Sequence, residues 1–540
     1  MTTGFSKERQ FTWHAFFICF VISFGALSFG YPTAILGTTF SQETFNTYMD
    51  LVDSDRKTTA GAQALIGATS GVYQAGAVVG ILIGIWIMDR FGRKICFTYA
   101  ALLGLIGAIG TCAAQNMAMF IAFRGLAGAG AWSALCISPV YVSELAPPKI
   151  RGLFVGLTGV FLMLGQALAS YMGLAFFSIG GSGSIQWRGP LGIQAIFPLI
   201  SLATVYWLPE SPRWLLMRDQ AEKAETVVLN LHCSTPAMKD YAIAEFFQMR
   251  TQSEFERTLD ASWYICLTKP SYRKRFVMCC LYGAISQSTG LLVISAYGSV
   301  LYGSLGYDAH DQILFQCGYI TVGVVFNILV AGGDVIVDIV GRKRLMVIGL
   351  TICSIWMTLE ASMVAAFASP VPEHPNRAGL AVAVAALYLF IASFATTVDT
   401  AGFVYYTEVF PNHLRAKGVS LAICSAALVD VVYLQVAGTA FASIGWKFFL
   451  IFIIIPIIGT IYIALVFPEL KGLPLEEVGA IFGDDDEVMV FSESIHVNHN
   501  NHELAFSKRR AQGLVTETSK TSTKSNSGNI EEEQIEVLDV

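Results

Sequence analysis

Charged side chains are scarce in this chain of 540 residues. Asp, Glu, Lys and Arg together make up 14% of the residues, whereas a soluble globular chain carries about 25%. Hydrophobic residues make up 54% of the sequence, and the mean hydropathy is +0.57. The chain has too little charge to cover a water-facing surface, which predicts an integral membrane protein.

Several sequence signals of other protein classes are also missing. None of the 11 cysteines forms a CxxC pair, so we interpret them as small apolar packing residues without a disulfide framework or a metal site. The net charge is only -6 and no basic arm is present, so nucleic acid is not an expected partner. No HExxH or GxSxG motif points to an enzyme. We expect no cofactor and no obligate protein partner.

Long hydrophobic runs, by contrast, are abundant. The runs from Ala15 to Leu36 and from Phe448 to Phe467 are long enough to cross a bilayer, which takes roughly 20 apolar residues in a helix. Such runs predict an all-α membrane protein with twelve transmembrane helices. The predicted spans lie near residues 13–37, 63–88, 95–115, 118–143, 152–177, 189–208, 276–302, 313–338, 345–368, 378–407, 418–442 and 447–467.

The distribution of Lys and Arg predicts the orientation. They concentrate in the loops after spans 2, 4, 8 and 10, whereas Ser304 to Gln312 contains two acids and neither Lys nor Arg. Basic loops face the cytoplasm, and an even number of spans then places both termini there. The predicted layout is a cytoplasmic N-terminus (1–12), a six-helix bundle (13–208), a polar cytoplasmic linker with short helices (209–275), a second six-helix bundle (276–467) and a cytoplasmic tail (468–540), disordered after about residue 483.

Three short motifs occur once in each half of the chain. The sequence DRFGRK after span 2 is matched by DIVGRK after span 8. ELAPPKIRG after span 4 is matched by EVFPNHLRAKG after span 10, and PES after span 6 by PEL after span 12. One six-span unit used twice, with the halves related by an axis along the membrane normal, explains this pattern.

The charges in these motifs suggest a gate. Carboxylates and guanidiniums at the inner ends of spans can form bidentate pairs that bridge helices and must break for the inner face to open. The alternative is that they only set the topology and snorkel to the interface. The candidate gating residues are Asp89, Arg93, Glu144, Arg151, Glu210, Arg213, Asp338, Arg342, Glu408 and Arg415.

These motifs resemble those of the sugar porters of the major facilitator superfamily, over about residues 13–483 and most closely in the fungal branch. The resemblance implies two six-helix bundles that give alternating access to a sugar or polyol site between them. It also implies a multi-pass protein, for which we predict the plasma membrane, with sugar and lipid bilayer as its partners. A nutrient sensor on the same scaffold is an alternative, although such sensors have much longer tails.

The resemblance also suggests substrate-binding residues, with departures. Gln166 and Gln287 stand at amide positions of the family, Ser286 replaces a Gln, and Phe403 replaces a stacking Trp. Asn327 is a weaker candidate. Amides donate and accept hydrogen bonds and an aromatic face covers C–H surface, so this set meets the minimum for a sugar. Each amide could instead only join helices.

Proton coupling is the second departure. Symporters of the family carry an Asp after Phe-Gly-Tyr in span 1, where this chain has Pro32, yet the partner Arg124 is kept. A buried arginine needs a counter-ion, so we expect Arg124 to find another acid or water. Loss of the Asp favours facilitated diffusion. The acids Asp399 and Asp430 inside predicted spans leave proton symport open, with protons then as a further partner.

Overall fold

The computed structural model describes most of the chain. The described residues are 12–40, 42–52, 61–147, 150–178, 183–233, 236–260, 262–304, 307, 309–332, 339–367, 377–471, 477–484, 487, 495–498, 503–507 and 535–538. Asp338, one of the predicted gating residues, lies outside them.

Twelve helical segments in the described chain are long and apolar enough to cross a membrane. This confirms the predicted all-α membrane fold, and most span ends agree with the prediction within a few residues. The segments are Trp13–Phe40, Ala64–Phe91, Arg93–Cys112, Met117–Leu145, Arg151–Ser178, Ile185–Trp207, Pro270–Gly298, His310–Leu329, Arg342–Phe367, Ala378–Val409, Asn412–Phe441 and Gly445–Val466.

Several spans are interrupted helices. The first span consists of α1 (Trp13–Phe24) and α2 (Leu27–Phe40), and the sixth of α8 (Ile185–Ile193), α9 (Ile196–Thr204) and η2 (Val205–Trp207). The seventh divides into α14 (Pro270–Gln287) and α15 (Leu291–Ser304) at Gly290, whose φ of 86° is left-handed and favours glycine. The tenth contains a π-helical turn, described with the site below.

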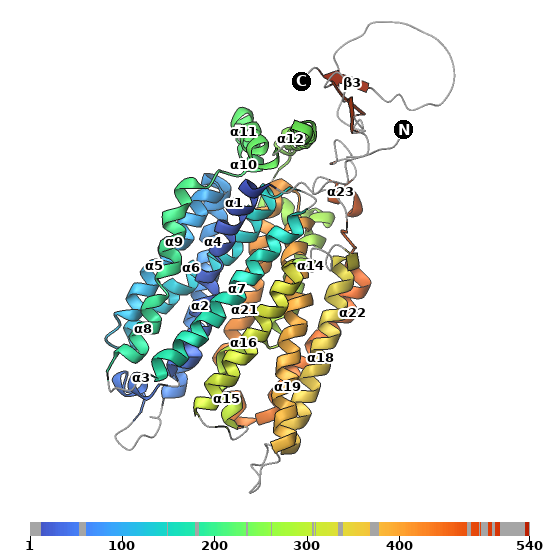
Figure 1. Cartoon of the computed structure of the whole chain (residues 1–540). Helices are drawn as coiled ribbons and strands as arrows, with labels where there is room; N and C mark the ends of the chain where they lie inside the picture. The colour runs from blue at the N-terminus through green and yellow to red at the C-terminus, as the bar shows by residue number, and fades with distance from the viewer. Residues whose placement is uncertain are drawn as a thin grey trace, which may run out of the picture.

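The spans form two bundles (Figure 1). The first contains α1, α2, the short α3 (Glu43–Tyr48), α4 (Ala62–Phe91), α5 (Arg93–Cys112), α6 (Met117–Leu145), α7 (Arg151–Ser178), α8 and α9. The second contains α14, α15, α16 (Ala309–Gly332), α18 (Arg342–Phe367), α19 (Arg377–Phe394), η3 (Ala395–Asp399), α20 (Thr400–Val409), α21 (Asn412–Ser443), η4 (Gly445–Phe448) and α22 (Phe449–Val466).

Glycine allows close helix packing within the first bundle. A Cβ added at Gly76 of α4 would lie 2.0 Å from the carbonyl oxygen of Gly125 in α6, and one at Gly128 would lie 2.0 Å from that of Tyr73. Small residues bring backbones together in this way inside membranes, where hydrophobic burial does not drive association. The bundles contact each other along α4 with α21 and along α7 with α16.

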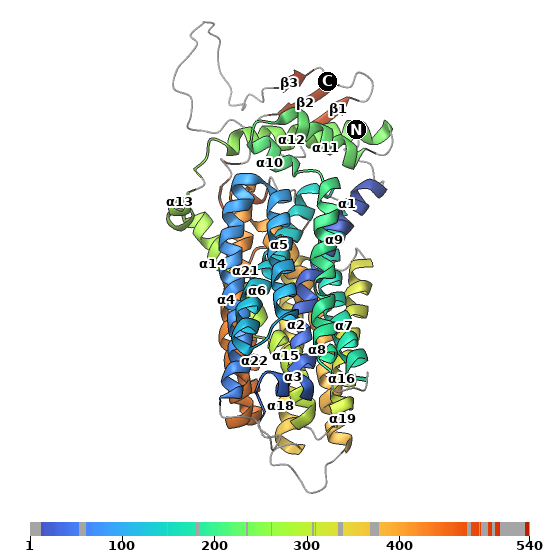
Figure 2. The ribbon, with the colours of Figure 1, turned by 90° about the vertical axis from the view of Figure 1, so that its left-hand side faces the viewer.

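The linker between the bundles forms four short helices at one end of the molecule, which we call the linker end (Figures 1 and 2). They are α10 (Pro212–Met217), α11 (Ala221–His232), α12 (Pro236–Glu256) and α13 (Trp263–Thr268). The hydroxyl of Thr12, just before α1, donates a hydrogen bond of 2.5 Å to the carbonyl of Leu231 in α11. The first span therefore begins at the linker end.

The described part of the tail contains a short helix and three short strands, and the predicted disorder after about residue 483 stays a prediction. The short α23 (Val478–Ile481) precedes three strands, β1 (Ile495–Asn498), β2 (Glu503–Ser507) and β3 (Ile535–Leu538). The strands form an antiparallel sheet in the order β1-β2-β3. Asp484 lies 2.6 Å from Arg275 of α14, so the beginning of the tail is joined to the second bundle by an ion pair.

Candidate functional site

The DRFGRK motif forms a turn that is capped from another part of the chain. Gly92 separates α4 from α5 with a φ of 99°. A Cβ there would lie 2.4 Å from Oε2 of Glu210, so the absence of a side chain lets this carboxylate approach. Oε1 and Oε2 of Glu210 accept hydrogen bonds from the backbone N–H groups of Arg93 (2.9 Å) and Lys94 (3.3 Å). The first N–H groups of α5 thereby gain an acceptor and a favourable negative charge.

The second half repeats this arrangement. Gly341 has a φ of 97°, and a Cβ there would lie 2.5 Å from Oε2 of Glu469. The N–H of Arg342 donates 2.8 Å to Oε1 of Glu469, at the start of α18. The PES and PEL motifs therefore supply the acids that cap the two Gly-Arg-Lys turns.

The two arginines form matching ion pairs. Nε and Nη2 of Arg93 donate hydrogen bonds of 2.8 and 2.7 Å to the two carboxylate oxygens of Glu144. Arg342 donates the same two hydrogen bonds, both of 3.0 Å, to Glu408. All four residues are buried. Each bidentate pair joins two helices of the same bundle, α5 with α6 and α18 with α20.

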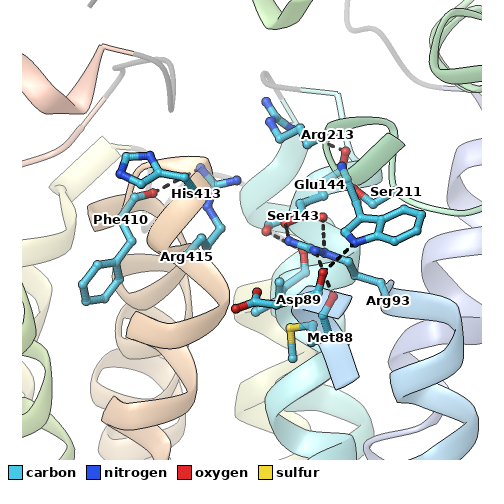
Figure 3. Close-up of polar contacts among 12 residues, drawn as sticks. Met88, Asp89, Arg93, Ser143, Glu144, Ser211, Arg213, Phe410, His413 and Arg415 are labelled. Atoms are coloured by element: carbon cyan, nitrogen blue, oxygen red, sulfur yellow. Dashed lines mark hydrogen bonds and ion pairs between the residues drawn. The ribbon is translucent and has the colours of Figure 1, made fainter. Parts of the chain in front are cut away.

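Charged residues of the two bundles also approach each other at this end. Nζ of Lys417 on α21 lies 3.9 Å from Oδ2 of Asp89 at the end of α4. Arg415 on α21 acts electrostatically on Glu144 of the first bundle, and Figure 3 shows Arg415 and His413 across from Asp89, Arg93 and Glu144. Nη1 of Arg213 donates a hydrogen bond of 3.3 Å to the carbonyl of Glu144. Arg151, another predicted gating residue, is buried at the start of α7. The predicted gating residues in the described chain therefore gather at the linker end.

Helix α12 contacts both bundles, directly or through one residue. Oε2 of its Glu245 lies 2.8 Å from Nδ1 of His232, and Nε2 of His232 lies 2.9 Å from the carbonyl of Leu145 in α6. Near the other end of α12, Glu256 accepts 3.2 Å from the N–H of His413 in α21. Burial disfavours the charged form of His232, but Glu245 and the Leu145 carbonyl outweigh this and raise its pKa. We call this connection the α12 strap.

A cavity of about 60 Å³ lies between the bundles. Gln166 of α7 lines it from the first bundle, and Ser286, Gln287 and Phe403 line it from the second. Four of the five predicted substrate residues therefore surround one space. Ligand sites usually measure about 300–1,000 Å³, so the bundles must separate further to admit a sugar.

Several residues that line this cavity contain buried polar atoms without partners. Nε2 of Gln166, Nε1 of Trp132 and Oε1 of Gln287 are buried and have no hydrogen-bond partner among the described residues. Such groups are costly to leave unpaired. Two donors and one acceptor are therefore available for a hydroxylated ligand.

An acid also lines the cavity. Asp399 ends η3, and its Oδ2 accepts 3.4 Å from Nδ2 of Asn327 in α16. Asn327, the fifth predicted residue, therefore contacts Asp399 and is not itself part of the lining. A Cβ added at Gly159 of α7 would lie 3.3 Å from Oδ2 of Asp399. The Asp399 carboxylate thus reaches the first bundle at a position where that bundle has no side chain.

The other predicted coupling residues lie apart from the cavity lining. Nη1 of Arg124 donates 3.0 Å to the carbonyl of Pro32, and its guanidinium carbon lies 4.2 Å from the ring centre of Tyr73. No acid pairs with it among the described residues, so the expected replacement acid is not found there. Asp430 is buried in α21, and its Oδ2 has no partner in the described chain.

Sequence reasoning missed the aromatic part of the lining, which contains Phe29, Trp132, Tyr282, Phe394 and Tyr406. The one available signal was Trp132, a single large side chain in the run Ala127–Ala134 of otherwise small residues. No group of three or more His, Cys, Asp or Glu residues that could hold a metal occurs in the described chain. The lining is suited to an uncharged or cationic organic ligand.

Two bundles, a duplicated set of turn motifs and a central cavity define a transporter of the major facilitator type. The family model described as "Sugar (and other) transporter" matches residues 18–482. The chain belongs to this family of sugar porters, whose members are transporters and not enzymes.

Named relatives and solved structures agree with this assignment. The chain is 27% identical to a high-affinity glucose transporter of Kluyveromyces lactis, over 89% of this chain and 87% of that one. It is 28% identical to an arabinose-proton symporter of Bacillus subtilis, over 75% of this chain and 83% of the relative. The proton:xylose symporter XylE, solved with a bromodeoxyglucose, has the same fold with a TM-score of 0.74 and 24% identity, covering 87% of this chain and 99% of that chain.

Proposed function

We propose that this sugar transporter moves a sugar or sugar-like polyol by alternating access and facilitated diffusion, with the linker end in the cytoplasm of a plasma-membrane protein. The unpartnered amide and indole groups support a hydroxylated substrate, because they offer hydrogen bonds of both kinds. The basic loops support the orientation.

The surroundings of Arg124 are the main support for facilitated diffusion over proton symport. Symport needs a group whose protonation biases the two conformations differently. Proline cannot titrate, and the Pro32 carbonyl and the Tyr73 ring occupy the guanidinium in place of a carboxylate. Arg124 then serves helix packing between α2, α4 and α6.

Proton symport is the second candidate, because one acid does line the cavity. Asp399 could take up a proton there, and one relative is named as a proton symporter. The two candidates differ in the source of energy: a facilitator equilibrates its substrate, whereas a symporter concentrates it.

Uptake of labelled glucose, xylose and arabinose into cells without their own sugar transporters, with and without a protonophore, tests the proposal. We expect the initial rate to survive the protonophore and the internal concentration never to exceed the external one. Accumulation that is abolished both by the protonophore and by Asp399→Asn would overturn facilitated diffusion. Failure to transport any sugar or polyol would overturn the substrate class.

A further inference from the structure

Among the described side chains, the central cavity has an acidic lining residue and no basic one. Among the described residues that line it, Asp399 is the single ionisable acid and no Lys, Arg or His is present. Within the described chain, its carboxylate accepts one hydrogen bond, from Asn327 at 3.4 Å. An ionised carboxylate in such a place lacks a counter-charge.

The same cavity is lined by aromatic faces. Phe29, Trp132, Phe394 and Phe403 line it together with Tyr282 and Tyr406. An aromatic face attracts a cation through its quadrupole, by about 0.5–2 kcal/mol depending on desolvation. A carboxylate beside aromatic rings is a combination that favours an organic ammonium group over a neutral one.

The local backbone fixes Asp399 toward this space. The hydroxyl of Thr400 donates 3.0 Å to the carbonyl of Ala395, five residues earlier, across the π-helical turn. The hydroxyl of Tyr282 donates 2.7 Å to the carbonyl of Val398. A π-turn inserts one extra residue into a helix and is frequent at functional sites. Here it places a carboxylate opposite Gly159 of the other bundle.

We infer that the cavity selects a polyol that carries a protonated amine, such as an amino sugar, with Asp399 as the partner of the ammonium group. The hydroxyls of the ligand would meet Gln166, Gln287 and the Trp132 indole. The inference rests on the proposed function, since it names the substrate class of the same site.

Binding of matched probes to the purified full chain tests this inference. Isothermal titration with D-glucose, D-glucosamine and N-acetyl-D-glucosamine compares a hydroxyl, an ammonium and a neutral amide at one position, at a pH well below the pKa of the amine. We expect glucosamine to bind at least about ten-fold more tightly than either neutral probe, as one charge-assisted hydrogen bond allows.

Substitutions test whether Asp399 causes the preference for glucosamine over glucose. Asp399→Asn should bring the ratio of the affinities for glucosamine and glucose close to one. Gly159→Ala places a methyl group of the first bundle against the Asp399 carboxylate. It should lower the ratio of the affinities for glucosamine and glucose. Glu360→Gln removes another buried carboxylate of the second bundle, one outside the cavity lining, and should leave the ratio unchanged.

The outcomes separate the inference from the proposed function. Equal affinity of the native chain for the three probes would overturn the ammonium site. The proposal of sugar transport would remain. So would a preference that Asp399→Asn retains, or that Glu360→Gln removes. Absence of binding and uptake for every hydroxylated probe would overturn the proposed function itself.

Discussion

The side chains predicted to bind substrate and those predicted to form a gate lie in different places. Amide and aromatic side chains surround the cavity, whereas ion pairs of Arg with Glu lie at the linker end. A substitution at either place should therefore change a different kinetic quantity.

The amide of Gln287 allows a test of the cavity. If this amide binds the substrate, its loss leaves substrate hydroxyl groups without hydrogen-bond partners, which costs roughly 1–3 kcal/mol of binding free energy. Gln287→Ala should raise the transport KM about ten-fold, measured as initial uptake over a range of substrate concentrations. Gln316→Ala, which removes an amide of α16 outside the cavity lining, is the control and should keep the native KM. An unchanged KM in Gln287→Ala would reduce this side chain to a contact between helices.

The carboxylate of Glu408 allows a test of the linker end. In the Gln variant the buried guanidinium of Arg342 keeps an acceptor for only one of the two bonds and loses its counter-charge, and removing one charge of a buried pair costs about 3–5 kcal/mol. Glu408→Gln should loosen α18 from α20 and lower transport about ten-fold or more, with normal surface expression. Glu254→Gln, in an exposed pair with Arg250, is the control. Native transport by Glu408→Gln would contradict a gating role.

Turns and short helices connect these side chains to the fold. The two Gly-Arg-Lys turns are equivalent because each needs a left-handed glycine and an acid from a distant motif. Neither requirement can be seen in one motif alone, since the capping acid lies 117 residues further along the chain in the first half.

Gly92 tests that explanation. Gly92→Ala should lower the melting temperature of the purified protein, because the new methyl group would be strained at φ 99° and would meet Glu210. Gly61→Ala separates the two effects, since Gly61 has a φ of 104° and nothing within 4 Å of an added Cβ. The loss should be larger for Gly92→Ala. Equal losses would mean that the approach of Glu210 contributes nothing.

The α12 strap should respond to pH. The raised pKa of His232 means that its pair with Glu245 contributes stability that is complete below the ordinary value of 6.5 and is lost as the pH rises through the raised value. We expect hydrogen exchange of α11 and α12, corrected for its intrinsic rate, to increase across that range. His232→Gln should remove the pH dependence. A native chain whose corrected exchange stays constant with pH would contradict the role of this pair.

The spans and their pairing into halves could be predicted from sequence because long apolar runs and repeated motifs are local features. The composition of the cavity could not. Which face of a span Trp132 or Asp399 occupies depends on how twelve helices pack, and the π-turn before Thr400 has no sequence signal that we recognised. The start of α14 at Pro270 was also missed, because its first turns are polar where they meet the tail at Asp484.

At the scale of the molecule, the proposed alternating access requires the bundles to separate at the linker end. Cysteines at Asp89 and Lys417, joined by a short bifunctional maleimide, should abolish transport, because their side chains lie on opposite bundles 3.9 Å apart. The native cysteines of the described chain are buried or half-buried and should react slowly. The double variant before cross-linking and each single variant treated in the same way give the reference rates, because Asp89 is itself a predicted gating residue. Full activity after complete cross-linking would show that this end does not open.

The position of the bidentate pairs inside each bundle has a consequence for how the bundles can move. Because Arg93 with Glu144 and Arg342 with Glu408 keep their partners when the bundles tilt as rigid bodies, the strongest contacts at this end need not break in a turnover. The contacts that such a tilt would change lie between the bundles, among them Asp89 with Lys417, Arg415 with Glu144, and Glu256 of α12 with His413. Each half can therefore tilt as a stiff unit without separating a buried ion pair.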